Sequence, residues 1–124
     1  MKTPTRKQLT GIAIAVAMGL SPALVFAHGT LESATPAAGS TIEGSPDTLR
    51  LAFNEDLESA FSTVKVLDAK GAAVSKEKAK VDAANPRVLT IALPKLPSDS
   101  YSVQWAVMTH DAHKTKGTYA FQVK

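Results

Sequence analysis

The sequence predicts an antiparallel β-sandwich, an all-β fold of about seven short strands. Apolar and polar residues alternate in several short segments, which is the pattern of strands with one buried face. Turns rich in Gly, Pro, Ser and Asp separate these segments, and no long amphipathic helix or internal repeat is evident. Many short strands with frequent turns within about 100 residues are typical of a sandwich.

Each expected strand ends at a turn. In chain order the strands cover residues 30–36, 48–53, 62–68, 87–93, 101–108 and 117–124. The polar NEDLESAF predicts a loop with a helical turn, and DAKG predicts a hairpin turn at Asp68–Gly71. The lysine-rich KEKAK predicts a solvated loop or a strand edge.

The alternation also predicts which side chains form the core. The apolar residues of TLRLAF, STVKVLD, YSVQWAVM and GTYAFQVK fall on one face of each strand. They are Leu49, Leu51, Phe53, Val64, Val66, Tyr101, Val103, Trp105, Val107, Tyr119, Phe121 and Val123. We expect five aromatic residues to be core rather than a surface that stacks on a cofactor. These are Phe53, Phe61, Trp105, Tyr119 and Phe121.

Residues 1–27 have the features of a secretory signal peptide. Basic residues without acids open the segment, the apolar run GIAIAVAMGL follows, and small residues precede the expected cleavage site. The apolar run is short for a membrane-spanning helix, which needs about 20 residues. We therefore expect cleavage after Ala27, export, and a mature domain of residues 28–124 whose first residue is His28.

The charge balance predicts no nucleic-acid or membrane-surface footprint. The chain has 14 Lys and Arg against 11 Asp and Glu, a formal charge of +3. The surplus basic residues all lie in the expected signal peptide, so the remaining domain is formally neutral. The chain has no cysteine, which excludes disulfides, thiolate catalysis, iron–sulfur clusters and cysteine-ligated zinc.

The histidines outside the signal peptide predict a metal site. After cleavage the α-amine and imidazole of His28 can chelate one ion together. Asp111 and His113 are spaced i, i+2 after strand 101–108, so an extended backbone places both on one side and His110 on the other. Nitrogen ligands with one oxygen in a tetragonal plane suit Cu(II). An Asp-x-His pair also occurs on ordinary surfaces, and composition alone does not bring the two ends of the chain together.

Several motifs follow one another along the domain. They are the His after the signal peptide, SATPAAGS, LAFNE, and the segment from Trp105 to Val123, WAVMTHDAHKTKGTYAFQV. This ordered set resembles the CopC family of periplasmic copper-binding proteins over nearly the whole mature chain. The resemblance implies a Greek-key, Ig-like β-sandwich that binds one Cu(II) per chain through His28, Asp111 and His113 in the periplasm.

The resemblance also implies roles for neighbouring residues and for partners. Glu55 matches an acidic residue that lies near the copper in the family, which makes it a candidate to hold the amine or a bound water. An exposed loop acid without such a role is the alternative interpretation of Glu55. Thr109 and Ala112 stand where the family often has Ser and Gly. His110 matches no family ligand, and we expect it to be exposed rather than an extra weak ligand. The implied partners are the copper ion and an inner-membrane copper permease or another copper-handling protein, without nucleic acid, and a monomer is expected.

One departure from the family limits the expected copper chemistry. Some relatives bind Cu(I) through a methionine-rich loop in mid-chain, because soft thioethers select that ion. The corresponding stretch, LDAKGAAVSKEKAKVDAANP, has no methionine. A dedicated Cu(I) site is therefore not expected.

Two other functions fit parts of the pattern. An amine–imidazole copper site also resembles the histidine brace of copper mono-oxygenases, but this domain is small and lacks an evident aromatic substrate face. A carboxylate ligand also favours Cu(II) and disfavours redox cycling. The second alternative is an Ig-like interaction module without metal. The sequence has no GxSxG or P-loop motif. The prediction is a Cu(II)-binding protein of copper resistance or homeostasis and not an enzyme.

Overall fold

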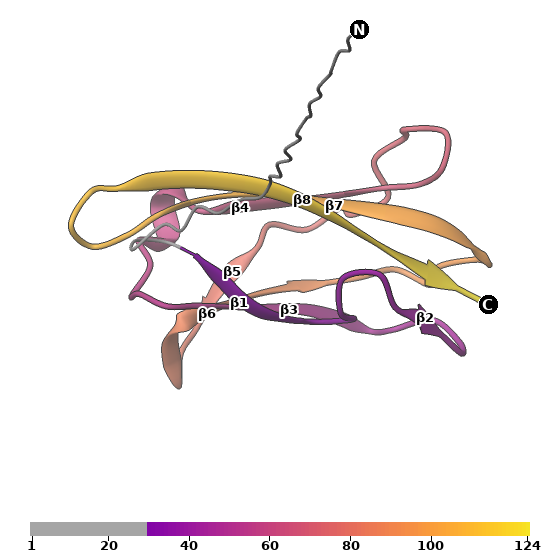
Figure 1. Ribbon diagram of the computed structural model, residues 1–124, viewed down its shortest axis with the longest axis horizontal. Helices are drawn as coiled ribbons and strands as arrows, with labels where there is room; N and C mark the ends of the chain where they lie inside the picture. The colour runs from indigo at the N-terminus through magenta and orange to yellow at the C-terminus, as the bar shows by residue number, and fades with distance from the viewer. Residues whose placement is uncertain (1–29) are drawn as a thin grey trace, which may run out of the picture.

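Two four-stranded β-sheets pack face to face in the computed structural model, which describes residues 30–124 (Figure 1). The strands are β1 (Leu31–Thr35), β2 (Thr41–Ile42), β3 (Thr48–Phe53), β4 (Thr63–Leu67), β5 (Lys80–Asp82), β6 (Asn85–Ala92), β7 (Asp99–Met108) and β8 (Lys114–Val123). A 3-10 turn, η1 (Ser59–Phe61), precedes β4. One sheet has the order β1-β3-β6-β5 and the other β2-β8-β7-β4. All pairs are antiparallel except β2 with β8, so the predicted antiparallel sandwich is confirmed.

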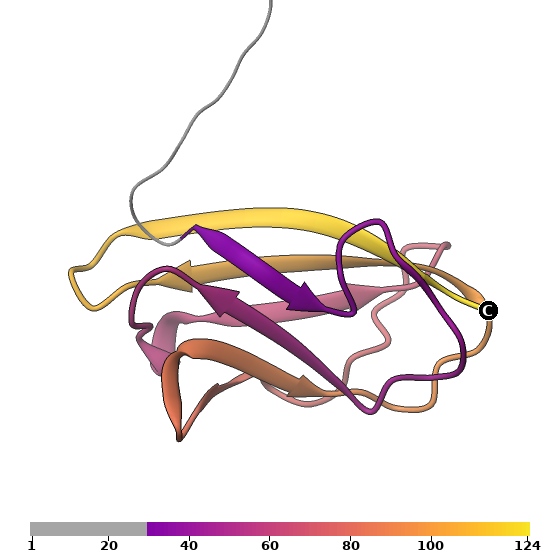
Figure 2. The same cartoon turned by 60° about the horizontal axis from the view of Figure 1, so that its bottom comes forward.

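The strand order is that of an immunoglobulin-type Greek key. Sheet β1-β3-β6-β5 corresponds to the A-B-E-D sheet of the constant-type fold, and β4-β7-β8 corresponds to C-F-G. The hydroxyl of Tyr101, near the start of β7, donates a hydrogen bond of 2.6 Å to the carbonyl of Pro97. This contact is the tyrosine corner of such sandwiches. Figure 2 places the β7–β8 turn at one end of the sandwich and the C-terminus at the other.

The core lies between the sheets and contains most of the alternating apolar residues that the sequence predicts. Val64, Trp105 and Tyr119 are partly buried and pack against it. The core also holds residues that the sequence analysis did not name, which are Leu57, Val88, Leu89, Ile91 and Leu96. Its members include Leu49, Leu51, Phe53, Val66, Tyr101, Val103, Val107, Phe121 and Val123, all at most 5% exposed. The rings of Phe53 and Trp105 meet edge to face with centroids 5.1 Å apart, which joins the two sheets. Tyr101 stacks on Phe121 within the other half of the core.

One core prediction is wrong, and two strands were not expected. Phe61 is 60% exposed, because it ends η1, a turn to which the strand alternation does not extend. The unexpected strands are β2 and β5, which are too short to show a period in the sequence. Residues 76–79 of the lysine-rich segment form an irregular stretch with Lys76 and Lys78 exposed, which agrees with the expected solvated loop, and Lys80 begins the edge strand β5.

The expected signal peptide, residues 1–27, lies outside the described residues, and so does His28. Over residues 30–124, no helix has the length and apolar character required to cross a membrane.

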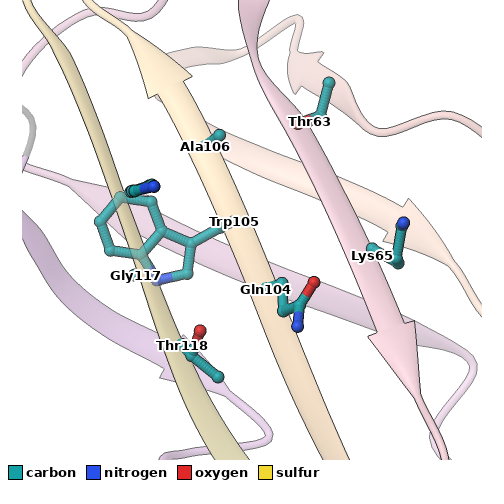
Figure 3. Close-up of a pocket in the computed structure, with 8 residues that line it drawn as sticks. Thr63, Lys65, Gln104, Trp105, Ala106, Gly117 and Thr118 are labelled. Carbon is teal, nitrogen blue, oxygen red and sulfur yellow. The ribbon is translucent and has the colours of Figure 1, made fainter. Parts of the chain in front are cut away.

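The side chain of Trp105 lies against Gly117, its partner across the β7–β8 pair (Figure 3). A Cβ atom built on Gly117 would lie 2.5 Å from the Cζ2 atom of the indole. No real side chain approaches so closely, so the absence of a side chain at Gly117 is what admits the indole at this place.

We predict that Gly117→Ala destabilises the domain by about 1–3 kcal/mol, because the added methyl displaces the indole from its place against Phe53. The same change in a Trp105→Leu background should cost clearly less, since the smaller side chain does not meet the new Cβ. Urea unfolding of the four proteins measures both costs. Equal costs in the two backgrounds would show that the Trp105 contact is not the cause.

Candidate metal centre

A tight turn connects β7 to β8 and carries Asp111 and His113. The N–H of Thr109 donates to the carbonyl of His113 at 2.9 Å, and the N–H of Ala112 donates to the carbonyl of Thr109 at 2.9 Å. Ala112 has a φ of 71°, in the left-handed region. The extended backbone predicted for residues 109–113 is therefore wrong, because reversing the chain between two antiparallel strands needs bent conformations.

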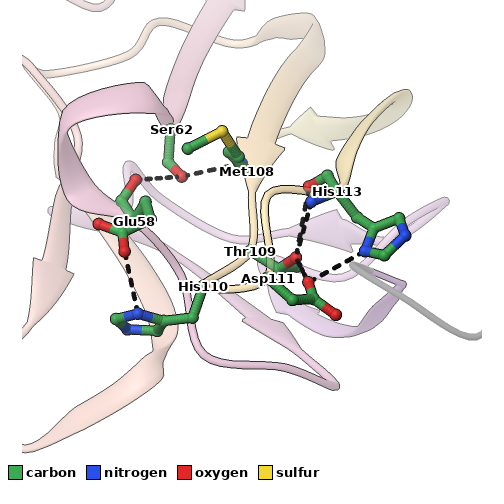
Figure 4. A network of polar contacts seen from close by, with 7 residues as sticks. All are labelled: Glu58, Ser62, Met108, Thr109, His110, Asp111 and His113. Atoms are coloured by element: carbon green, nitrogen blue, oxygen red, sulfur yellow. Dashed lines mark hydrogen bonds and ion pairs between the residues drawn. The ribbon is translucent and has the colours of Figure 1, made fainter.

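The turn nevertheless brings Asp111 and His113 together. Oδ1 of Asp111 lies 3.0 Å from Nδ1 of His113, and the two side chains are 47% and 54% exposed. Figure 4 shows both side chains on one side of the turn. A carboxylate oxygen and an imidazole nitrogen at this separation can be adjacent ligands of one ion, because metal–ligand bonds of about 2.0–2.2 Å at right angles put donors about 3 Å apart.

Thr109 orients this pair from the interior of the domain. It is fully buried, its hydroxyl donates to Oδ1 of Asp111, and the same hydroxyl accepts the N–H of His113 at 3.3 Å. One buried oxygen therefore sets the positions of both candidate ligands. In the sequence alone, Thr109 is notable only as a replacement for Ser. Thr109 lies two residues after the inward-facing Val107, so the alternation predicts that its side chain also faces inward. A hydroxyl buried at a strand end needs hydrogen-bond partners in the adjacent turn.

His110 lies on the other side of the turn, as predicted (Figure 4). Its Nδ1 is 2.9 Å from Oε1 of Glu58, and its N–H donates to the carbonyl of Asp56 at 3.1 Å. This side chain is 60% exposed. The structure thus separates His110 from Asp111 and His113, and it supplies Glu58 as a partner that the sequence did not indicate.

The segment after β3 joins the start of β1 to the turn. Asn54 exchanges two hydrogen bonds with Thr30: its N–H donates to the Thr30 carbonyl at 3.1 Å, and its Oδ1 accepts the Thr30 N–H at 2.8 Å. Glu55 follows in a half-buried bend. Leu57 then pairs with Thr109, and the N–H of Glu58 donates to Met108 at 2.8 Å. Residues far apart in the sequence therefore meet at one end of the sandwich.

Residues 30–124 do not by themselves hold a group of three or more His, Cys, Asp or Glu side chains arranged for a metal ion. Asp111 and His113 supply two donors, and a full set of ligands requires a further contribution. His28, the third predicted ligand, is outside the described residues.

Comparison with curated proteins finds relatives along most of the chain. The chain is 35% identical over 113 residues to "Copper resistance protein C" of Pseudomonas syringae pv. tomato, with 85% of this chain and 87% of that protein covered. It is 32% identical over 125 residues to "Protein YobA" of Escherichia coli strain K12, with both chains fully covered. It is also 29% identical over 103 residues to "Copper transport protein CutJ" of Bacillus subtilis. This match covers 82% of this chain but only 19% of CutJ.

Solved structures give the same result. CopC from Methylosinus trichosporium OB3b superimposes with a TM-score of 0.74 at 37% identity, covering 78% of this chain and 94% of that one. PcoC, a methionine-rich copper resistance protein from Escherichia coli, gives a TM-score of 0.68 at 32% identity, with 79% and 100% covered. Residues 31–124 match the CopC domain, so the chain belongs to the CopC family.

Proposed function

We propose that this protein binds one Cu(II) ion in the periplasm, through the free α-amine and imidazole of His28 together with Asp111 and His113. The observation that carries the proposal is the meeting of a carboxylate oxygen and an imidazole nitrogen 3.0 Å apart on the β7–β8 turn. The donor set of three nitrogens and one oxygen is the kind that Cu(II) prefers.

Chain connectivity supports the participation of His28. Thr30 is held against Asn54, at the end of the sandwich where Asp56 and Leu57 contact the β7–β8 turn. Two residues span at most about 7 Å, so the Cα of His28 stays within that distance of Thr30. A ligand two residues before Thr30 can therefore reach the end of the sandwich that carries Asp111 and His113.

Glu55 is proposed as a residue that supports the ligands. It lies in the bend directly after Asn54, which holds Thr30. A half-buried carboxylate at this place can accept a hydrogen bond from a coordinated amine or water, and such outer partners orient the ligands of a metal.

The role that we propose is copper binding for resistance or homeostasis, without catalysis. Relatives of the chain are named as copper resistance and copper transport proteins. The copper ion is the cargo in this proposal. An inner-membrane copper permease or another copper-handling protein is the proposed partner, and the binding form is a monomer.

The proposal predicts that signal-peptide cleavage creates the site. The protein that begins at His28 should bind Cu(II) with one-to-one stoichiometry, and one extra residue before His28 should weaken binding at least about a hundredfold, because the chelating amine is lost.

Affinity should also fall as the pH drops below the amine pKa of about 7.7–8.0, because copper must displace the proton of the amine. Competition titration against a chelator measures both effects. Equal binding by the two proteins would exclude the amine as a copper ligand, and binding by neither would contradict the proposed function.

The two histidines near the turn provide a matched pair of variants. His113→Gln should weaken Cu(II) binding at least about tenfold, because an imidazole nitrogen is lost. His110→Gln should change it less than about twofold, since this side chain faces Glu58. Electron paramagnetic resonance of the Cu(II) forms identifies the coordinated nitrogens. If the two variants lose affinity equally, His110 is a ligand and the assignment of the donors is wrong.

Variants of Thr109 separate orientation of the ligands from folding. Thr109→Val keeps the side-chain volume but removes the hydroxyl, so Cu(II) affinity should fall about 10–100-fold. Thr109→Ser keeps the hydroxyl and should retain copper binding, although the missing methyl lowers stability by about 1 kcal/mol. Affinity and urea stability are measured on both variants. Affinity that follows stability rather than the hydroxyl would contradict the orienting role.

A further inference from the structure

The outward face of the β4-β7-β8 sheet carries charge of one sign. Lys65 on β4 and Lys114 and Lys116 on β8 all point to solvent. None of the outward positions on these three strands is Asp or Glu. Among the described residues, no carboxylate forms an ion pair with these lysines. The other sheet differs, because there Arg50 pairs with Asp82 at 3.2 Å.

This face is hollowed into a groove. Two adjoining hollows, of about 520 and 420 Å³, share Thr63, Ala106 and Lys116 in their lining. The central strand β7 contributes Gln104 and the small Ala106 to the lining, and Thr63 pairs with Ala106 (Figure 3). The lysines lie on the two flanking strands, Lys65 on β4 and Lys114 and Lys116 on β8. Strands β4 and β8 are two sheet spacings apart, which makes the groove about 10 Å wide, enough for one extended chain.

Phe61 closes one end of the groove. It is 60% exposed and is the large apolar side chain most open to solvent among the described residues. It lines the same hollow as Lys114, which directly follows His113 in the sequence. The groove therefore combines an apolar end, a cationic rim and a position beside the candidate metal centre.

We propose that this groove binds an acidic protein segment that inserts an apolar side chain beside Phe61. Carboxylates of the segment complement Lys65, Lys114 and Lys116, and the phenyl ring with the lysine stems contacts the apolar side chain. A protein segment is favoured over a lipid surface because the face is concave, and a flat membrane would not reach the floor of the groove. The proposal does not depend on the identity of the copper ligands.

The test uses a short synthetic peptide of glutamates around a central leucine, titrated into the isotope-labelled protein and followed by amide chemical shifts. One control peptide replaces each glutamate with glutamine, and another replaces the leucine with glycine. We expect shifts concentrated on β4, β7, β8 and Phe61, affinity that decreases with added salt, and weaker binding of both control peptides.

Two charge-matched variants locate the binding. The groove variant combines Lys65→Gln, Lys114→Gln and Lys116→Gln. The control variant combines Lys76→Gln, Lys80→Gln and Lys95→Gln, which change exposed lysines that do not line the groove. The groove variant should bind the peptide about tenfold more weakly, because three exposed ion pairs are lost together, whereas the control should change less than about twofold. A Phe61→Ser variant should lose the preference for leucine over glycine.

Three outcomes would overturn the proposal. The first is an equal loss of peptide binding in the groove and control variants, which would mean non-specific attraction. The second is the absence of shifts along the groove. The third is binding of phosphatidylglycerol vesicles through the groove lysines while the peptide does not bind, which would identify the surface as a lipid site.

Discussion

The hydrogen bonds between the segment after β3 and the end of β7 are the constraint on which the candidate metal centre depends. Asn54 holds Thr30 at the start of β1, while Asp56 and Leu57 contact His110 and Thr109 at the start of the β7–β8 turn. Backbone groups make most of these contacts, so they follow from the topology of the sandwich more than from particular side chains. β1 begins at the end of the sandwich where β7 ends, so Thr30 and the β7–β8 turn are both attached to the segment after β3.

The buried hydroxyl of Thr109 fixes the conformation of the β7–β8 turn. A threonine hydroxyl with no solvent access must find partners within the turn, and Thr109 finds them in the Asp111 carboxylate and the His113 backbone. The two candidate ligands are half exposed, yet their geometry is set by a group in the interior. An exposed pair anchored in this way loses less side-chain freedom on binding a metal than two independent surface residues would.

Charge is separated across the molecule although the domain is neutral overall. On the β1-β3-β6-β5 sheet Arg50 is compensated by Asp82, whereas Lys65, Lys114 and Lys116 on the opposite sheet lack such a partner among the described residues. The net charge in the sequence therefore hides a local cationic surface. This surface lies beside the turn that carries Asp111 and His113, so a partner seated on it would be close to the candidate metal centre.

The sequence by itself determined the layers and the core of this protein. Alternation in strands such as β3 and β7 is a local property with a period of two, and the buried faces of Leu49, Leu51 and Val103 follow from it directly. The same reasoning failed for Phe61, because η1 lies outside that period. It also missed β2 and β5, which are shorter than any window in which alternation can be recognised.

Only the tertiary structure decided how the chemistry-bearing residues are arranged. The spacing of Asp111 and His113 indicated a pair, but their contact depends on a turn with a positive φ at Ala112 and on the buried hydroxyl of Thr109. Likewise, Glu58 is the partner of His110, and the groove lysines lie on β4 and β8, which are far apart in the chain. Local patterns specify which face of a strand is buried, whereas contacts between distant segments exist only after the two sheets have packed.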